Sequence, residues 1–292
     1  LNTSFEKNIM IEKVCIIGVG LIGSSLAKAL KNTGQAKFIC GYGRDADRLK
    51  KAKELNIIDE YYIDLKEAII DSDIVIIATP VGSYIEILSD IKPYLNIATL
   101  VTDVGSTKRS VIEAAEKVFG SLPHNFIPGH PIAGKEKRGF EACDGELFVN
   151  KKVIITPLES NDDESISRVQ NMWEKVGAEV DFMTPESHDE LLGMTSHLPH
   201  MLAFSLMNYL INENPSASVY AAGGFKDFSR IASGDTVMWR DICLNNKDQI
   251  IDHIKGYQKS LSALSEAIDN DDMEQLESIF SKAKASRESW LD

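Results

Sequence analysis

A glycine-rich segment is the first part of the chain whose residue types and spacing indicate chemistry. The segment GVGLIG, which starts at Gly18, has the spacing GxGxxG and directly follows an apolar, β-branched run. In this setting the first glycine permits a tight turn, the second lets a pyrophosphate approach the backbone, and the third allows close helix packing. The N–H groups at the start of the helix then face the phosphates. We therefore assign Gly18, Gly20, Leu21, Ile22 and Gly23 to a nicotinamide or flavin dinucleotide.

The end of the next strand bears on the choice of cofactor. An acidic residue that binds the adenosine ribose usually stands there, but residues 41–44 read GYGR. Arg44 could pair with a 2′-phosphate, stack on adenine or be solvated. Asp45 is expected to cap the following helix. The sequence predicts NAD or NADP, and it favours NADP or the use of both.

Two further strand ends contribute to this site. Ligands of doubly wound sheets gather at the carboxyl ends of the strands. Thr79 and Pro80 follow one predicted strand, and Asp103 closes the next. We assign these three residues to the cofactor site. Ser106, in TDVGSTK, is expected to cap the following helix, where its hydroxyl would also face the nicotinamide crevice.

A histidine between glycine and proline is the candidate general base. His130 lies in PGHPIAGKEK, residues 128–137, a loop whose composition fixes the backbone. The unperturbed pKa of histidine, about 6.5, leaves the ring largely neutral yet basic at neutral pH. His130 is therefore expected to remove a proton from the substrate.

Two histidines and an arginine in the second half could face a ligand. SHLPH, residues 196–200, places His197 and His200 three residues apart. A metal pair is the alternative, but no HExxH motif or cysteine set accompanies them, so we expect no metal. Arg230, in GGFKDFSR, is either a surface ion pair or a clamp for a carboxylate.

The first half of the chain alternates short apolar runs with amphipathic stretches, which predicts a doubly wound α/β unit. Strands are expected at residues 13–17, 38–42, 73–78, 98–103, 125–128, 152–156 and 179–182. Helices are expected at residues 21–33, 45–55, 83–91, 106–119 and 163–176. This Rossmann-type, dinucleotide-binding domain is expected to span residues 11–184.

From about Thr184 the strand signals end, and residues 185–292 are expected to form an all-α domain for substrate binding and dimerisation. Residues 197–211 are apolar on nearly all sides, which predicts a buried helix. The core of a homodimer is the favoured explanation. Burial within one subunit is the alternative.

Composition excludes several classes of function. The chain has 292 residues, with 31 Lys and Arg against 44 Asp and Glu, a net charge of −13. Such a charge repels nucleic acid, so we expect none as a partner. Four dispersed cysteines and the lack of a signal peptide in residues 1–9 predict a cytoplasmic protein. No apolar segment is long enough to cross a bilayer, so no membrane association is expected.

Five motifs in order give the chain a family resemblance. GVGLIGSSLA, TDVGSTK, GHPIAGKEK, SHLPH and GGFKDFSRIASGDTVMWRDI cover residues 11 to about 250. In this order they resemble the prephenate/arogenate (cyclohexadienyl) dehydrogenases of tyrosine biosynthesis. The resemblance implies NAD(P)-dependent oxidative decarboxylation of prephenate to 4-hydroxyphenylpyruvate, or of arogenate. It also implies a nucleotide domain followed by a helical dimerisation domain.

The resemblance also implies roles for individual residues. His130 would contact the ring hydroxyl and assist its deprotonation, and Ser106 would support that histidine and the hydroxyl. His200 and Arg230 would bind the substrate, with Arg230 on a carboxylate, and Trp239 would lie near the pocket. We further place three residues at the substrate site: Lys135, His197 and Gly223.

The sequence departs from the family pattern in two places and leaves alternatives open. Lys135 stands where relatives often have Thr, and GYGR lacks the acidic ending of NAD-specific members. The 292 residues suggest a single-function form. A β-hydroxyacid-type dehydrogenase and a non-catalytic NAD(P)-sensing protein are the other readings. The preference between prephenate and arogenate is left open.

Overall fold

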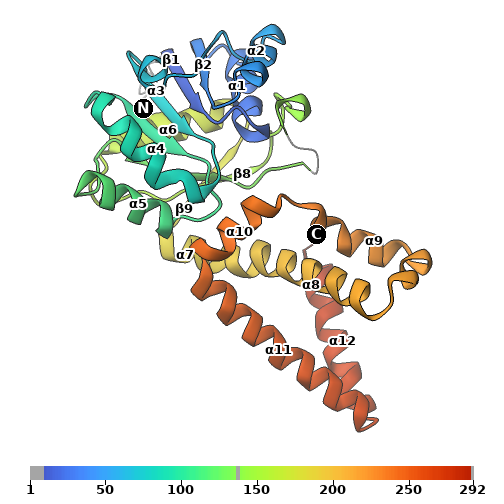
Figure 1. Ribbon diagram of the computed structural model, residues 1–292. Coiled ribbons are helices and arrows are strands. Elements are labelled where there is room, and N and C mark those ends of the chain that lie inside the picture. Colours follow the sequence, from blue (N-terminus) through green and yellow to red (C-terminus); the bar gives the residue numbers. More distant parts are fainter. Residues whose placement is uncertain (1–9, 136–138, 291–292) are drawn as a thin grey trace, which may run out of the picture.

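The computed structural model of this protein describes residues 10–135 and 139–290. The chain forms an α/β unit, whose last strand ends at Phe182, and a helical unit that extends away from it (Figure 1). The long helices α11 (Lys247–Asp269) and α12 (Met273–Glu288) meet at the far end of this extension.

A six-stranded parallel sheet forms the centre of the α/β unit, in the order β3-β2-β1-β4-β5-β6. Its strands are β1 (Ile11–Ile17), β2 (Ala36–Tyr42), β3 (Glu60–Tyr62), β4 (Ile74–Ile77), β5 (Leu100–Asp103) and β6 (Phe126–Ile127). The strand order reverses between β1 and β4, which confirms the doubly wound prediction. Ligands of such sheets bind at the carboxyl ends of the strands beside this switch point.

Helices cover both faces of this sheet, so its central strands are buried on both sides. The helices are α1 (Leu21–Asn32), α2 (Ala46–Glu54), α3 (Leu65–Ile69), α4 (Tyr84–Ile91), α5 (Arg109–Phe119) and α6 (Asp163–Lys175). Alternate residues of β1 enter two different cores: Ile16 packs with Leu26 of α1, and Ile17 packs in the cluster that contains Leu88 of α4. Burial on both faces explains why β1 is a continuous apolar run.

A second, three-stranded sheet was not separated from the first in the sequence prediction. It contains β7 (Gly129–Pro131), β8 (Lys152–Ile155) and β9 (Glu179–Phe182); β7 and β8 are antiparallel, and β8 and β9 are parallel. His130 lies on β7 opposite Ile154, so the prediction that it lies in a loop is wrong. The strand is only three residues long and contains Pro131, which explains why the periodicity did not reveal it.

The remainder of the described chain is helical, as predicted. The helices are α7 (Pro185–Leu192), α8 (Leu198–Glu213), α9 (Gly223–Ser229), α10 (Thr236–Asn245), α11 (Lys247–Asp269) and α12 (Met273–Glu288), with a π-helical turn at Gly193–His197. In α8 only Ala203 is buried, while Tyr209 and Ile211 are 65% and 52% exposed. The alternative that this helix is buried within one subunit is therefore wrong. Over the residues that the structure describes, no helix is long and apolar enough to span a membrane.

Candidate active site

The glycine-rich turn has the geometry that a dinucleotide needs. Gly18 has a φ of +100°, and a Cβ there would lie 2.7 Å from the Ala78 carbonyl oxygen. A Cβ on Gly23 would overlap the Gly18 carbonyl oxygen, so only glycine lets α1 pack this closely. A Cβ on Gly20 would meet no atom within 4 Å. Two glycines are thus required by packing, whereas Gly20 keeps a space open at the helix start.

The N-terminus of α1 has room and donors for an anion. Gly20 is the N-cap residue, and no side chain caps the helix. The first N–H groups of a helix lack intrahelical acceptors, so Leu21 and Ile22 can donate to a phosphate. Thr79 lies beside the turn, with its Cγ2 3.0 Å from the position of a Cβ on Gly18. The residues present therefore fit a bound dinucleotide, with Pro80 next to Thr79 on the same edge.

Arg44 lies just beyond the end of β2 and is exposed. The next residue, Asp45, accepts a hydrogen bond from Arg48 N at 3.1 Å and caps α2. This confirms the predicted helix cap. It also leaves Arg44 as the cation at the edge where the adenosine ribose is expected.

The side chain of Asp103 lies inside the protein and bonds to other protein groups. It is fully buried, and Oδ2 accepts hydrogen bonds from Tyr84 Oη (3.0 Å), Gly105 N (2.7 Å) and Lys108 Nζ (2.6 Å). Oδ1 accepts from Gly129 N at 3.0 Å. This carboxylate therefore joins the end of β5 to the start of β7, and the assignment of Asp103 to the cofactor site stays a prediction.

The N-terminus of α5 is capped by a residue from another unit of the chain. The helix begins at Arg109, and the predicted cap by Ser106 is wrong. Asp189 of α7 accepts hydrogen bonds from Lys108 N at 2.7 Å and Arg109 N at 3.0 Å. The Ser106 hydroxyl is half-buried and has no hydrogen-bond partner in the described part of the chain, which leaves it available to a ligand.

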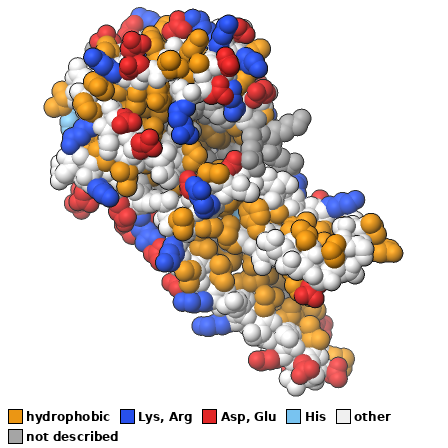
Figure 2. Space-filling model, in the orientation of Figure 1, with side chains coloured by type: hydrophobic (Ala, Val, Ile, Leu, Met, Phe, Trp, Pro, Cys, Tyr) orange, Lys and Arg blue, Asp and Glu red, His pale blue; other side chains and the backbone are white. Residues whose placement is uncertain are grey.

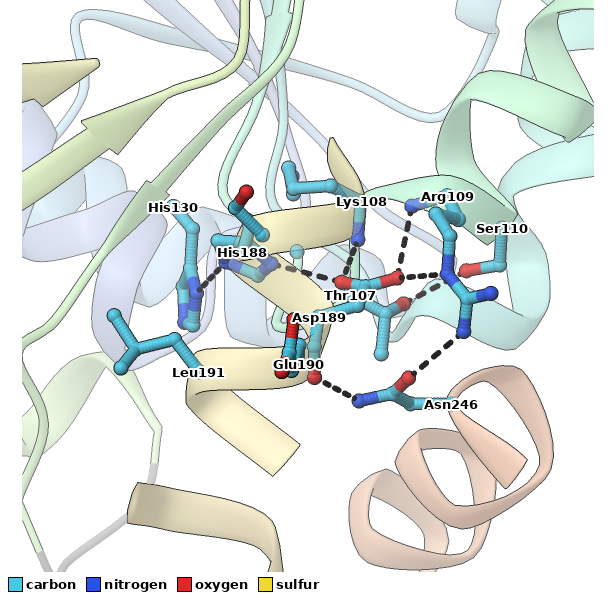
Figure 3. Close-up of polar contacts among 12 residues, drawn as sticks. Thr107, Lys108, Arg109, Ser110, His130, His188, Asp189, Glu190, Leu191 and Asn246 are labelled. Carbon is cyan, nitrogen blue, oxygen red and sulfur yellow. Dashed lines mark hydrogen bonds and ion pairs between the residues drawn. The ribbon is translucent and has the colours of Figure 1, made fainter. Parts of the chain in front are cut away.

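His130 contacts a second imidazole (Figure 3). Its Nδ1 lies 2.8 Å from Nε2 of His188, and the two rings meet edge to face. Burial lowers the pKa of His130 well below its ordinary value, and positive charge on His188, Lys108 or His197 would lower it further. The ring is therefore neutral near neutral pH. A neutral imidazole can accept a proton.

His197 is held by Asn246 of the turn before α11. Asn246 Nδ2 lies 3.1 Å from His197 Nδ1 and 2.8 Å from the Asp189 carbonyl oxygen. Because the amide nitrogen can only donate, His197 Nδ1 is the acceptor and Nε2 carries the proton. Burial lowers the pKa of His197 to about 4. Its Nε2 has no well-formed hydrogen bond among the described residues, although the Ser106 backbone lies beside the ring.

Two of the predicted substrate residues, His200 and Trp239, are in contact, and the charge of a third, Arg230, acts on the His200 ring. His200 stacks on Trp239 with ring centroids 3.8 Å apart, and its Nδ1 donates to the Ser196 carbonyl oxygen at 2.9 Å. Burial and the nearby Arg230 charge lower the pKa of His200. Trp239 also meets the edge of His197, so this aromatic ring links the two histidines.

The other predicted substrate residues lie further out. Lys135 pairs with Asp144 at 2.8 Å near the surface, and Gly223 is exposed at the first position of α9. The motif that contains Lys135 continues into residues 136–138, which lie outside the described residues. The described residues contain no cluster of His, Cys, Asp or Glu that could hold a metal ion.

The sequence prediction missed His188, Asp189 and Asn246. All three are fully buried, and the first two lie side by side on α7. One signal was present: His188, Asp189 and Leu192 have the spacing of one helix face, so an amphipathic reading of α7 would have placed a polar pair toward the interior.

The fold and the site together define a nicotinamide-dependent dehydrogenase with a helical second unit. The glycine turn lies at the switch point of the sheet, and the histidines come from β7, α7 and the start of α8.

The chain belongs to the prephenate dehydrogenase family. The family's nucleotide-binding domain matches residues 26–182, and its dimerization domain matches residues 184–282. The chain is 34% identical to the prephenate dehydrogenase of Bacillus subtilis (strain 168), over 96% of this chain and 76% of that protein. It is 31% identical to the cyclohexadienyl dehydrogenase of Zymomonas mobilis, over 94% of both chains. Both similarities extend across the two units.

A solved structure agrees with this assignment. The crystal structure of prephenate dehydrogenase from A. aeolicus, in complex with hydroxyphenyl propionate and NAD+, has a TM-score of 0.91 and 38% identity. It covers 98% of this chain and 100% of its own. The arogenate dehydrogenase of Synechocystis has a TM-score of 0.80 and 28% identity, and covers 95% of this chain and 99% of its own. The similar structures thus include proteins named for each of the two substrates.

Proposed function

We propose that this protein catalyses the oxidative decarboxylation of prephenate, or of arogenate, with NAD or NADP. With prephenate the products are 4-hydroxyphenylpyruvate, CO2 and the reduced cofactor. One observation carries the proposal: a neutral imidazole, His130, lies on the strand that Asp103 joins to the end of β5, at the carboxyl edge of the sheet. The family membership and the names of the relatives support the choice of substrate.

His130 would act on the ring hydroxyl of the substrate. When bound, the nicotinamide accepts a hydride from the ring carbon that carries this hydroxyl. The carbon then develops carbonyl character, and His130 Nε2 stabilises the change by accepting the hydroxyl proton. The bond to the ring carboxylate breaks, its electron pair completes the aromatic ring, and CO2 leaves. The proton returns to the oxygen of the phenol, so atoms and charge balance.

Other side chains would orient the substrate. The His197 ring lies beside the Ser106 backbone. Neither the His197 Nε2–H nor the Ser106 hydroxyl has a well-formed partner among the described residues, so both suit the ring hydroxyl. Arg230 would bind a carboxylate, with His200 beside it and Trp239 as an apolar wall. Lys135 and Gly223 stay predicted contacts. Contacts that hold the substrate ring in one orientation next to the reacting groups increase the rate of the reaction.

The cofactor preference is part of the proposal. Arg44 is an exposed cation just beyond the end of β2, and residues 41–44 contain no acidic residue. A guanidinium pairs well with a phosphate. We therefore favour NADP, or use of both cofactors.

We further propose a homodimer formed through the helical unit, with units at residues 11–184 and 185–292. Hydrophobic side chains gather over the helical half of the face shown in Figure 2. Exposed apolar residues lie on α8, α11 and α12, among them Tyr209, Leu261 and Phe280. Apolar area of this kind is stabilised by a second copy of the chain. The four free cysteines support a reducing, cytoplasmic location.

One assay tests the proposed activity. Formation of reduced cofactor and release of CO2 are measured with prephenate and with arogenate, each with NAD and NADP. The proposal predicts equal amounts of both products with at least one pair. Oxidation of a β-hydroxy acid without CO2 would instead favour a β-hydroxyacid-type dehydrogenase, and cofactor binding without any turnover would favour a sensing protein.

A further inference from the structure

A buried chain of three side chains leads from His130 into the protein (Figure 3). His130 Nδ1 lies 2.8 Å from His188 Nε2, and His188 Nδ1 lies 2.8 Å from Asp189 Oδ1. His188 and Asp189 are fully buried. The proposed reaction uses only the far end of this chain, so the two inner residues have no role in it yet.

The carboxylate at the inner end is ionised and cannot move freely. Asp189 accepts from Lys108 N, Arg109 N and Arg109 Nε, at 2.7, 3.0 and 3.3 Å. Burial raises the pKa of Asp189, but the hydrogen bonds from His188 and from these N–H groups outweigh it and leave the pKa lowered. The carboxylate also lies at the N-terminus of α5, where the helix dipole favours negative charge.

These contacts permit one arrangement of protons. An ionised carboxylate only accepts, so His188 Nδ1 carries a hydrogen and donates to Asp189. Burial lowers the pKa of His188, so the ring is neutral and its Nε2 has no hydrogen. The bond between the two rings must then be donated by His130 Nδ1. Because His130 is also neutral, its Nε2 is left bare.

We propose that His188 and Asp189 are positioning residues that hold His130 in the Nδ1–H tautomer, so that its Nε2 is the only proton acceptor presented to the substrate. The inference rests on the proposed function for its effect on rate, but the tautomer itself is a property of the protein alone. Once Nε2 accepts a proton, the Nδ1–H of His130 still donates to His188, and His188 in turn donates to the Asp189 carboxylate. The same arrangement fixes the base in Ser-His-Asp hydrolases.

The hydrogen-bonded chain His130–His188–Asp189 also joins the two units of the protein. His188 and Asp189 come from α7, whereas His130 comes from β7 and the capped N–H groups come from the start of α5. Asn246 and Arg109 complete the contact, with Arg109 Nη2 3.2 Å from Asn246 Oδ1. The tautomer of the base therefore depends on the docking of α7 against α5.

Two substitutions at His188 separate its contacts. In His188→Asn, the amide can take the place of Nδ1 and keep the bond to Asp189, but it cannot reach His130. In His188→Gln, the longer side chain can place an oxygen where Nε2 was and accept from His130 Nδ1–H. We expect kcat to fall about 100-fold or more in the Asn variant, with substrate KM within about threefold, and to recover in large part in the Gln variant. His253→Asn is the matched control. His253 also contacts α7, through the Glu190 carbonyl oxygen, but it is not one of the three hydrogen-bonded side chains.

The tautomer is read directly by nitrogen NMR of histidine-labelled protein, since the chain has only six histidines and His130→Asn assigns the signal. The expected spectrum shows His130 protonated at Nδ1 and bare at Nε2, and a mixture of tautomers in His188→Asn. The groups facing His130 that could move its titration are His188, Lys108 and His197, with Asp189 behind them, so spectra are compared at one pH.

The outcomes distinguish this inference from the proposed function. A His130 ring protonated at Nε2 in the wild type would overturn it, as would His188→Asn with unaltered kcat or a Gln variant no better than the Asn variant. If the predicted tautomer is observed in a protein that oxidises neither prephenate nor arogenate, the proposed function fails. The inference that His188 and Asp189 fix the tautomer of His130 is then still supported.

Discussion

The glycine-rich turn and the histidine chain are built in opposite ways. The turn is one continuous segment from β1 into α1, and its three glycines act within a few residues of one another, with Ala78 as the main outside contact. The chain from His130 to Asp189 joins β7, α7 and the start of α5. Cofactor binding is therefore encoded locally, whereas the proposed acid–base chemistry depends on the packing of distant segments.

The largest effect is expected from a substitution of Asp189, the inner end of the chain His130–His188–Asp189. Asp189→Asn removes the charge behind His188 and weakens the cap of α5, so we expect kcat to fall about 100-fold or more. The loss of the cap should also cost about 2 kcal/mol of unfolding free energy. Asp248→Asn is the matched control, because Asp248 pairs with the same Arg109 but is 57% exposed. Steady-state kinetics that showed equal losses in both variants would contradict the assigned role.

A second substitution tests the assembly on the substrate side. Arg230→Ala should raise substrate KM by about 10- to 100-fold, because a charge-assisted hydrogen bond contributes roughly 1.5–3 kcal/mol. The kcat value and cofactor KM should change little. If the variant instead melts at a lower temperature with an unchanged KM, then Arg230 is a structural residue.

Two glycine substitutions separate the contribution of the turn to cofactor binding from its contribution to packing. Gly20→Ala meets no neighbour, so it should fold normally but raise cofactor Kd about tenfold by obstructing the pyrophosphate. Gly23→Ala overlaps the Gly18 carbonyl and should cost about 1–3 kcal/mol of stability. Thermal melts and cofactor titration of both variants measure this contrast. Equal melting temperatures would show that close packing does not require Gly23.

The smallest expected effect concerns one cofactor only. Arg44→Ala should raise the KM for NADP about tenfold and leave the KM for NAD nearly unchanged, since only NADP carries the 2′-phosphate. Arg48→Ala is the control: Arg48 lies on the neighbouring helix but faces Phe140 and Glu141. An equal change for both cofactors in Arg44→Ala would remove this residue from the assignment.

Local pattern was sufficient to predict the doubly wound sheet, the helical second half and the glycine turn. Each of these depends on periodicity or on contacts between near neighbours, as for Asp45 at the start of α2. The cap of α5 was predicted wrongly because Ser106 is the nearest candidate in sequence, whereas Asp189 reaches the helix from 80 residues away.

The roles of Asp103 and His188 were also beyond prediction from local sequence. A carboxylate at a sheet edge resembles a ligand contact, but the burial of Asp103 by Tyr84 and Lys108 is a tertiary property. His188 has no motif around it, and its role follows only from its 2.8 Å contact with His130. Residues whose partners are distant in sequence therefore require the structure.

The rate of the His130→Asn variant shows whether His130 is the general base. With saturating cofactor and prephenate or arogenate, we expect kcat to fall at least about 100-fold, while substrate KM and cofactor Kd stay within about threefold. Because the pKa of His130 lies below its ordinary value, wild-type kcat/KM should hold its plateau as pH falls through 6.5 and decline only at lower pH. A His130→Asn protein with wild-type kcat would show that His130 is not the general base.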